Sequence, residues 1–186
     1  MRIISGKFRG RNLVKSDHIK SLRPTTDKNR ETLFNILSFW KFAEEINFQL
    51  RDSKILDLCC GSGAIGFEAL SRGAKFVTFV DNNREHLELL NQNVALLKVE
   101  NECEIICADA KNFNQSKKDF DLVFLDPPYE QDPLPMVKNL IEKDFISEKT
   151  LLVVEAKSSQ EVQNFSPLKL LEIRKYGLTT FSFLRK

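Results

Sequence analysis

The chain has 186 residues, of which 42% are hydrophobic and 29% are charged. This length suits one well-buried α/β domain and is too short for two domains of ordinary size. No run of about 18 apolar residues predicts a membrane span, and the basic N-terminus lacks the apolar stretch and cleavage site of a secretory signal. We therefore expect a cytoplasmic protein.

The net charge of +2 is unevenly distributed. Nine Lys or Arg and two acids fall within residues 1–30, which gives this segment +7 and leaves −5 for the rest of the chain. Basic side chains displace counterions from phosphates, so a basic arm on an acidic body fits a surface that docks a polyanion. From charge alone, a solvated hairpin is an equally good interpretation.

The N-terminal segment predicts two elements. Residues 2–15 alternate around Gly6 and Gly10, which is typical of a β-hairpin. Thr25 and Thr26 are suited to cap a helix that starts near Asp27, where apolar residues recur at helical spacing.

From Lys54 onward, short apolar runs alternate with helical segments, which predicts a mostly parallel sheet covered on both faces. The last two runs are joined only by Tyr176 and Gly177. They must therefore form a hairpin, with one strand antiparallel to the rest. The expected strands are Ile55–Cys59, Phe76–Val80, Glu104–Cys107, Leu122–Leu125, Leu151–Glu155, Leu168–Lys175 and Leu178–Leu184, with helices near 64–72, 84–98 and 134–143.

A glycine-rich loop follows the first of these strands. Gly61, Gly63 and Gly66 form a G-x-G-x-x-G pattern, in which glycines allow a tight turn and a close approach to a ligand. Asp81 lies twenty residues after Gly61 and ends the next strand. Its carboxylate is placed to accept hydrogen bonds from the hydroxyls of a ribose. The pattern alone fits NAD as well as S-adenosylmethionine.

Asp57 favours S-adenosylmethionine. A carboxylate four residues before the first glycine would repel a dinucleotide pyrophosphate, whereas S-adenosylmethionine carries an ammonium and a sulfonium. A loop-bracing role is the alternative for Asp57. Asp109 ends the third strand and is placed to accept from an adenine amino group, with a plain turn or cap as its alternative. The predicted cofactor-binding residues are Asp57, Gly61, Ser62, Gly63, Asp81, Asn82, Asp109 and Ala110.

A strand ending in Asp126-Pro127-Pro128-Tyr129 carries the predicted chemistry. In an open α/β sheet this end faces the ligand crevice, and the prolines leave carbonyl groups as rigid acceptors. The lone pair of an exocyclic base amine is delocalised. If Asp126 and the Pro127 carbonyl hold its two hydrogens, that lone pair can point at a methyl group, and Tyr129 can stack on the base. We predict these four residues as catalytic, with a rigid turn as the alternative.

The sequence gives no sign of a metal site. The cysteines lie in apolar runs without the paired spacing of a structural zinc site, so we expect buried, reduced thiols. We expect His18 and His86 to be surface residues. The four cysteines are Cys59, Cys60, Cys103 and Cys107.

Together, residues 2–11, 23–35 and 61–74 and the tetrapeptide at Asp126 resemble the RsmD family, the bacterial 16S ribosomal RNA guanine-N2 methyltransferases. The resemblance covers nearly the whole chain. It implies a Rossmann-like class I methyltransferase domain in residues 46–186, with a mostly parallel seven-stranded sheet and an antiparallel C-terminal strand. Residues 1–45 would form an N-terminal hairpin and helix appendage.

The resemblance also implies S-adenosylmethionine as methyl donor and a guanine of 16S rRNA as substrate, in the small ribosomal subunit or its assembly intermediate. We expect a monomer without a metal, whose basic segment holds rRNA phosphates. Arg23, Thr25 and Arg30 are equally compatible with folding over the cofactor. An adenine-N6 methyltransferase, an NAD-dependent oxidoreductase and an inactive RNA-binding factor are the competing interpretations. The predicted RNA-binding residues are Lys7, Arg9, Arg11, Arg23 and Arg30.

Overall fold

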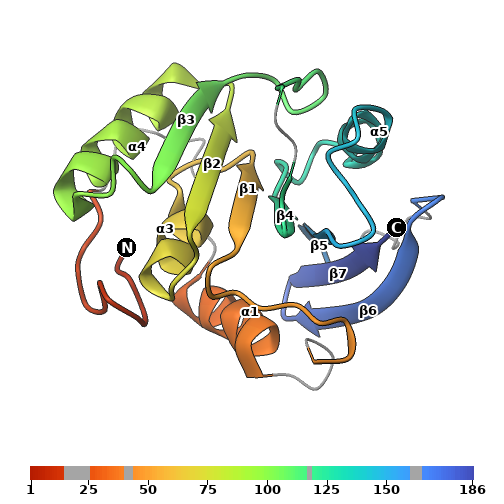
Figure 1. The fold of residues 1–186 in the computed structure, drawn as a ribbon, viewed down its shortest axis with the longest axis horizontal. Helices are drawn as coiled ribbons and strands as arrows, with labels where there is room; N and C mark the ends of the chain where they lie inside the picture. The colour runs from red at the N-terminus through yellow and green to blue at the C-terminus, as the bar shows by residue number, and fades with distance from the viewer. Residues whose placement is uncertain (15–25, 40–43, 117–118, 160–164) are drawn as a thin grey trace.

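A computed structural model describes residues 1–14, 26–39, 44–116, 119–159 and 165–186. Its helices and strands follow the predicted order (Figure 1). The helices are α1 (Asp27–Phe39), α3 (Ala64–Ser71), α4 (Arg84–Leu97) and α5 (Leu134–Glu142). The strands are β1 (Lys54–Leu58), β2 (Phe76–Asp81), β3 (Cys103–Cys107), β4 (Leu122–Leu125), β5 (Leu151–Lys157), β6 (Lys169–Tyr176) and β7 (Thr179–Arg185).

The strands form one sheet in the order β3-β2-β1-β4-β5-β7-β6. The first five strands of this order pair in parallel, and β7 runs antiparallel to both β5 and β6. This confirms the predicted mostly parallel sheet with an antiparallel strand at its C-terminal end. Chain order reverses at β1, and in such sheets ligands bind beyond the carboxyl ends of the strands at the reversal.

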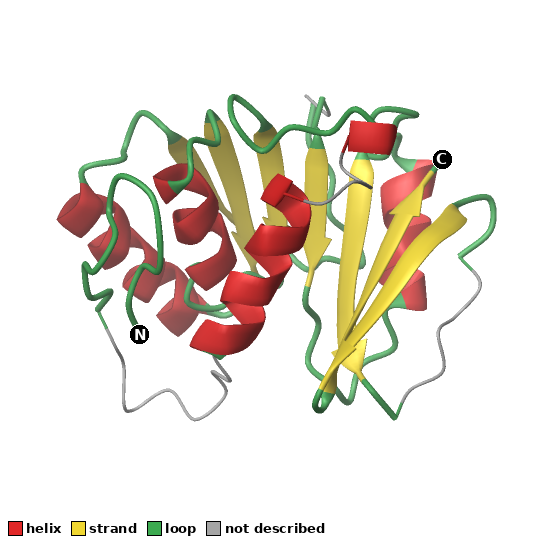
Figure 2. Cartoon of the chain, turned by 90° about the horizontal axis from the view of Figure 1, so that it is seen from below, coloured by secondary structure: helices red, strands yellow, loops and turns green. Residues whose placement is uncertain are grey.

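Helices cover both faces of the sheet (Figure 2). On one face, Phe34 of α1, Phe67 of α3 and Leu90 of α4 belong to one buried cluster. On the other face, Leu140 of α5 belongs to a second cluster. Along the central strands, successive residues alternate between the two clusters, as the twofold repeat of a strand requires. Within one strand, residues with odd numbers therefore point to one face of the sheet and residues with even numbers point to the other.

The third glycine of the loop is required by packing. A Cβ atom on Gly66 would lie 2.2 Å from a ring carbon of Phe79, which no real Cβ contact permits. The ring centroids of Phe67 and Phe79 are 4.8 Å apart, so helix α3 lies directly on strand β2. Close helix-to-strand packing is the role expected of a glycine at this point in the pattern.

Residues 1–14 form a loop that turns back on itself. One antiparallel bridge joins Arg2 and Asn12, and the Ile3 amide donates to the Arg11 carbonyl at 2.9 Å. The predicted hairpin is thus present as a loop closed by a single bridge, without regular strands in residues 1–14.

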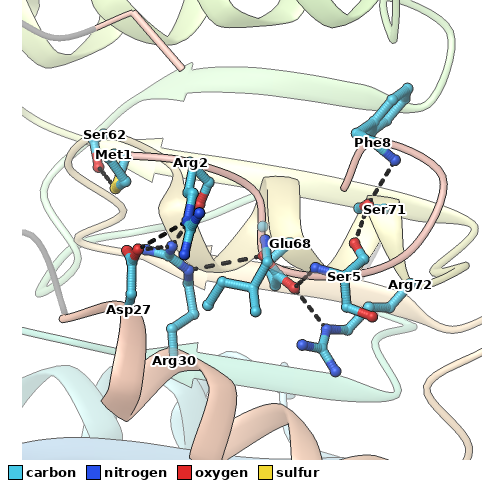
Figure 3. Close-up of polar contacts among 12 residues, drawn as sticks. Met1, Arg2, Ser5, Phe8, Asp27, Arg30, Ser62, Glu68, Ser71 and Arg72 are labelled. Atoms are coloured by element: carbon cyan, nitrogen blue, oxygen red, sulfur yellow. Dashed lines mark hydrogen bonds and ion pairs between the residues drawn. The ribbon is translucent and has the colours of Figure 1, made fainter. Parts of the chain in front are cut away.

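A buried carboxylate of α3 fastens this loop to the domain (Figure 3). Glu68 is fully buried and accepts hydrogen bonds from the amides of Ile4 at 2.8 Å and Ser5 at 3.0 Å. Its carboxylate also accepts from Arg72 Nε at 2.7 Å and lies 3.8 Å from Arg30 Nε. These contacts satisfy the acid, which would otherwise be costly to bury.

The segment before residue 45 shares its core with the rest of the protein. Ile3, Leu13 and Leu33 are buried in the same cluster as β1 and β5 residues. The division into residues 1–45 and 46–186 stays a prediction.

Candidate active site

The loops that follow the central strands are joined to each other at one edge of the sheet. The Asp126 amide donates to the Leu58 carbonyl at 3.3 Å, which links the end of β4 to the end of β1. The Cys60 amide donates to the Val80 carbonyl at 3.1 Å, which links the glycine loop to β2. The glycine loop and the Asp126–Tyr129 tetrapeptide therefore lie side by side.

A cavity of about 740 Å³ opens at this edge. Pockets for small molecules typically measure about 300–1,000 Å³. Gly63 is the only predicted residue of the two groups that does not line it, and instead caps α3 with a φ of 73°. The predicted residues that line it are Asp57, Gly61, Ser62, Asp81, Asn82, Asp109, Ala110, Asp126, Pro127, Pro128 and Tyr129.

Asp57 is an almost fully buried acid, with 1% of its surface exposed. Its carboxylate accepts a hydrogen bond from the Gly66 amide at 3.0 Å, which is the loop-bracing contact named as its alternative role. Burial raises the pKa of Asp57 well above its usual value, and the nearby charges of Asp126 and Asp81 raise it further, while the Gly66 hydrogen bond opposes them. A cation in the cavity would relieve this repulsion.

Asp81 is held by three partners. Its carboxylate accepts from the amides of Gly61 at 2.8 Å and Asn83 at 2.9 Å, and lies 3.1 Å from His86 Nδ1. Burial acts to raise the pKa of Asp81, but the hydrogen bonds from His86 and the two amides outweigh it and lower the pKa. The expectation that His86 is a surface residue was wrong, because the side chain is buried against Asp81. His18 lies outside the described residues.

The rim of the cavity is polar. Asp109 and Asn82 are exposed there, whereas Ala110 is buried. The Asp109 carboxylate accepts from the Lys111 amide at 2.9 Å, which is the turn contact named as its alternative role. That contact occupies one oxygen of the carboxylate.

The tetrapeptide forms a tight turn. Pro127 is buried, Asp126 is half-buried, and the Pro128 carbonyl accepts from the Gln131 amide at 2.8 Å. Because the Pro128 carbonyl is used in this turn, the Pro127 carbonyl remains the acceptor predicted to act beside Asp126.

Residues that the sequence did not indicate as part of the site also line the cavity. Tyr129 Oη lies 3.4 Å from Thr179 Oγ1, which accepts from Asn29 Nδ2 at 3.0 Å. These contacts connect the tetrapeptide to β7 and α1 and restrict the orientation of the tyrosine ring. Thr26 and Glu155 line the same cavity. Neither residue belongs to one of the two motifs. Glu155 ends a predicted strand, however, and the rule that strand carboxyl ends face the ligand crevice could have indicated it.

The basic residues of the N-terminal loop lie at the opposite edge of the sheet. The Lys7 amide donates to the carbonyl of Ser71, the last residue of α3, at 2.7 Å. Its ammonium pairs with Glu102, which directly precedes β3. Arg9 and Arg11 are exposed on the same loop. The structure therefore does not bring these three cations to the cavity.

Arg30 is misassigned as a phosphate ligand. The side chain is 1% exposed, and its guanidinium donates to the Arg2 carbonyl at 2.7 Å and to Asp27 at 2.9 Å (Figure 3). With these partners and Glu68 nearby, Arg30 is a structural residue of the loop anchor. Arg23 and Thr25 lie outside the described residues.

The cysteines are all free, as expected, but not all buried. Cys107 is exposed and Cys59 is half-buried at the cavity, where burial and the nearby acids raise the pKa of its thiol to about 12. Within the described ranges, no group of three or more His, Cys, Asp or Glu could hold a metal ion. No helix in the same ranges is long and apolar enough to cross a membrane.

The strand order, the glycine loop after β1 and the acid-proline turn after β4 define a class I methyltransferase. Comparison with known families agrees. A family model described as "Conserved hypothetical protein 95" matches residues 1–185, and the chain belongs to this family. This membership confirms the resemblance to the RsmD family.

Curated relatives match over most of their length. The chain is 37% identical to ribosomal RNA small subunit methyltransferase D of Escherichia coli, over 90% of this chain and 78% of the relative. It is 33% identical to the protein of the same name from Haemophilus influenzae, over 97% and 91% of the two chains. The solved structure of Escherichia coli yhhF superimposes with a TM-score of 0.82 at 28% identity, covering 100% of this chain and 97% of that one.

Proposed function

We propose that this protein transfers a methyl group from S-adenosylmethionine to the exocyclic N2 amine of a guanine in 16S rRNA. The observation that carries the proposal is the hydrogen bond between the Asp126 amide and the Leu58 carbonyl, with the cavity that both strand ends line. It joins the predicted cofactor loop to the predicted base-binding turn. The two reactants can therefore meet in one cleft.

The charge of the cavity fits the cofactor. Asp57, Asp81, Asp109 and Asp126 all line it. Burial is the largest cause of the raised pKa of Asp57, and the charges of Asp126 and Asp81 add to it. S-adenosylmethionine carries an ammonium and a sulfonium, which suit a carboxylate wall, whereas the pyrophosphate of NAD would be repelled. Asp57, Gly61, Ser62, Asp81, Asn82, Asp109 and Ala110 would hold the cofactor, with Gly63 shaping the loop.

The residues of the turn then position the base. The bound cofactor supplies a methyl group activated by its sulfonium. Asp126 and the Pro127 carbonyl accept hydrogen bonds from the two N–H groups of the amine. The nitrogen lone pair is then directed toward that methyl group. Tyr129, held by Thr179, stacks on the base and sets its plane. Alignment of this kind gives effective molarities of about 10⁵–10⁸ M, and Asp126 is placed to accept the proton released after transfer.

The substrate assignment is supported by the two relatives, which are named as ribosomal RNA small subunit methyltransferases. We propose that the protein acts as a monomer in the cytoplasm, on the small subunit or its assembly intermediate. A folded RNA can present an unstacked base directly.

The test is methyl transfer from tritiated S-adenosylmethionine to small subunits purified from cells that lack this protein, followed by digestion to nucleosides. We expect label on guanosine, at N2. Label on adenosine would overturn the choice of base, and no label in either subunits or naked 16S rRNA would overturn the function. Calorimetry with NAD and S-adenosylmethionine separately tests the cofactor.

We propose that Lys7, Arg9 and Arg11 bind rRNA phosphates at a distance from the cavity. Arg9 and Arg11 are exposed, and a large RNA can contact both edges of the sheet at once. Replacing all three with Gln is expected to weaken RNA binding and to reduce its salt dependence. Unchanged affinity and unchanged salt slope would make the loop purely structural.

A further inference from the structure

Glu155 is a buried acid in the wall of the cavity that the proposed chemistry does not yet use. It lies near the end of β5, is 3% exposed, and lines the same cavity as Asp126 and Tyr129. Acids are rarely buried to this extent, and one carboxylate oxygen of Glu155, Oε2, is buried without a hydrogen bond. Its position on the side of the cavity toward β7 makes it a candidate for contacting the base.

The strand register places Glu155 beside Asp126. The last aligned pair of β4 and β5 is Leu125 with Val154, and Asp126 and Glu155 are each one residue further along. Asp126 is two residues after Phe124, and Glu155 is two residues after Val153. Phe124 and Val153 both lie in the cluster on the α1 face, so Asp126 and Glu155 are on that face too. Neighbouring strands are about 4.8 Å apart. The register therefore puts Asp126 and Glu155 at neighbouring positions on the same face of the sheet.

Two adjacent carboxylates repel each other, and a ligand edge rich in N–H donors relieves that repulsion. The Watson–Crick edge of guanine is such an edge, because the N1–H donor lies directly beside the N2 amine. Adenine differs at this point, since its N1 carries a lone pair and accepts. We infer that Glu155 accepts the N1–H of the guanine whose N2 amine is held by Asp126, and that it selects guanine over bases without an N1–H.

This inference rests on the proposed function and adds a residue that determines its specificity. A site built to accept a hydrogen bond from the substrate rejects an analogue that lacks the donor. In such an analogue the buried carboxylate would face the lone pair of N1. The free-energy difference comes from a single atom position on the base. It can therefore be tested with a base that keeps the reacting amine but has a hydrogen-bond acceptor at N1 in place of the donor.

2-Aminopurine is that probe, because it keeps the 2-amino group but has an unprotonated N1. The modified nucleotide is first mapped with the wild-type protein. 16S rRNA carrying guanine or 2-aminopurine there is then prepared by ligation and assembled into small subunits. Methyl transfer is measured for the wild-type protein and the E155Q variant, whose amide can donate to N1. The missing O6 of 2-aminopurine affects both proteins alike and cancels in the comparison.

The wild-type protein is expected to prefer guanine by about 100-fold or more, and E155Q by less than about 10-fold. An unchanged preference in E155Q would overturn the role of Glu155. If E155Q does not bind S-adenosylmethionine, E155D carries the test, and loss of the preference while its carboxylate remains would also overturn it. Failure of the wild-type protein to methylate guanine at all would instead overturn the proposed function.

Discussion

Replacing Asp57 with Asn removes a buried charge from the cavity and keeps the hydrogen bond from the Gly66 amide, which the amide oxygen of Asn can accept. Burial raises the pKa of Asp57 in the folded protein, so the folded state binds its proton more tightly than the unfolded chain does. Stability should therefore fall as the pH rises from the ordinary carboxyl pKa through the raised one. The D57N variant escapes this loss.

The size of the effect follows from the pKa difference. Each tenfold change in the acid dissociation constant corresponds to about 1.4 kcal/mol, and each kcal/mol moves Tm by about 2–4 °C in a chain of this length. We expect D57N to melt several degrees above the wild-type protein at pH 8 without cofactor. The gap should shrink toward pH 4. Affinity for S-adenosylmethionine should fall at the same time, because the carboxylate that faces its cationic groups is gone.

The assay is thermal unfolding of both proteins from pH 4 to pH 8, with calorimetry of cofactor binding at pH 8. D121N is a matched control. Asp121 also accepts a backbone N–H, from Lys54 at 2.8 Å, but it precedes β4 at the far edge of the sheet. Asp121 does not line the cavity, so we expect D121N to leave the affinity for S-adenosylmethionine unchanged. If D57N melts at or below the wild-type protein across the whole range, the reasoning from buried charge is wrong.

Three further variants test the packing around the site. T179V removes the hydroxyl beside Tyr129, so turnover should fall about fivefold while cofactor affinity stays unchanged. An unchanged rate would show that Thr179 does not position the tyrosine ring. E68A leaves the buried partners of Glu68 without their acid. The free energy of unfolding, measured by chemical denaturation, should fall by about 3–5 kcal/mol, and residues 1–14 should be proteolysed faster. G66A would bring a methyl group against Phe79, so its Tm should drop by an amount equivalent to about 1–3 kcal/mol, and a wild-type Tm would show that the ring can move.

The strands of the sheet were predicted well because each strand is specified by a short stretch of neighbouring residues. Alternation of apolar runs and helical segments located each strand found in the described residues, and the two-residue link at Tyr176 required the antiparallel pair. The position of the glycine loop and the acid-proline turn followed from the rule that strand ends meet at one edge.

The predictions that failed depend on distant partners. From the sequence, Arg30 was predicted to bind phosphate, because its positive charge suits a phosphate ligand and a buried ion pair equally well. Only the structure shows it buried beside Asp27 and the Arg2 carbonyl. His86 reads as a surface residue until Asp81 is seen against it. Glu155 and Thr179 were missed for the same reason. Neither belongs to a motif, and the pairing of β5 with β4 and with β7 brings them to the cavity.

Methyl transfer by the D126A variant tests whether the acid after β4 acts on the base amine. Single-turnover labelling of small subunits with tritiated S-adenosylmethionine compares wild-type protein, D126A and D119A, in which the exposed Asp119 at the far edge is the control. We expect D126A to lose at least about 100-fold in rate while binding cofactor and subunits as the wild type does, and D119A to keep full activity. Undiminished transfer by D126A would contradict the convergence of cofactor and base on this residue.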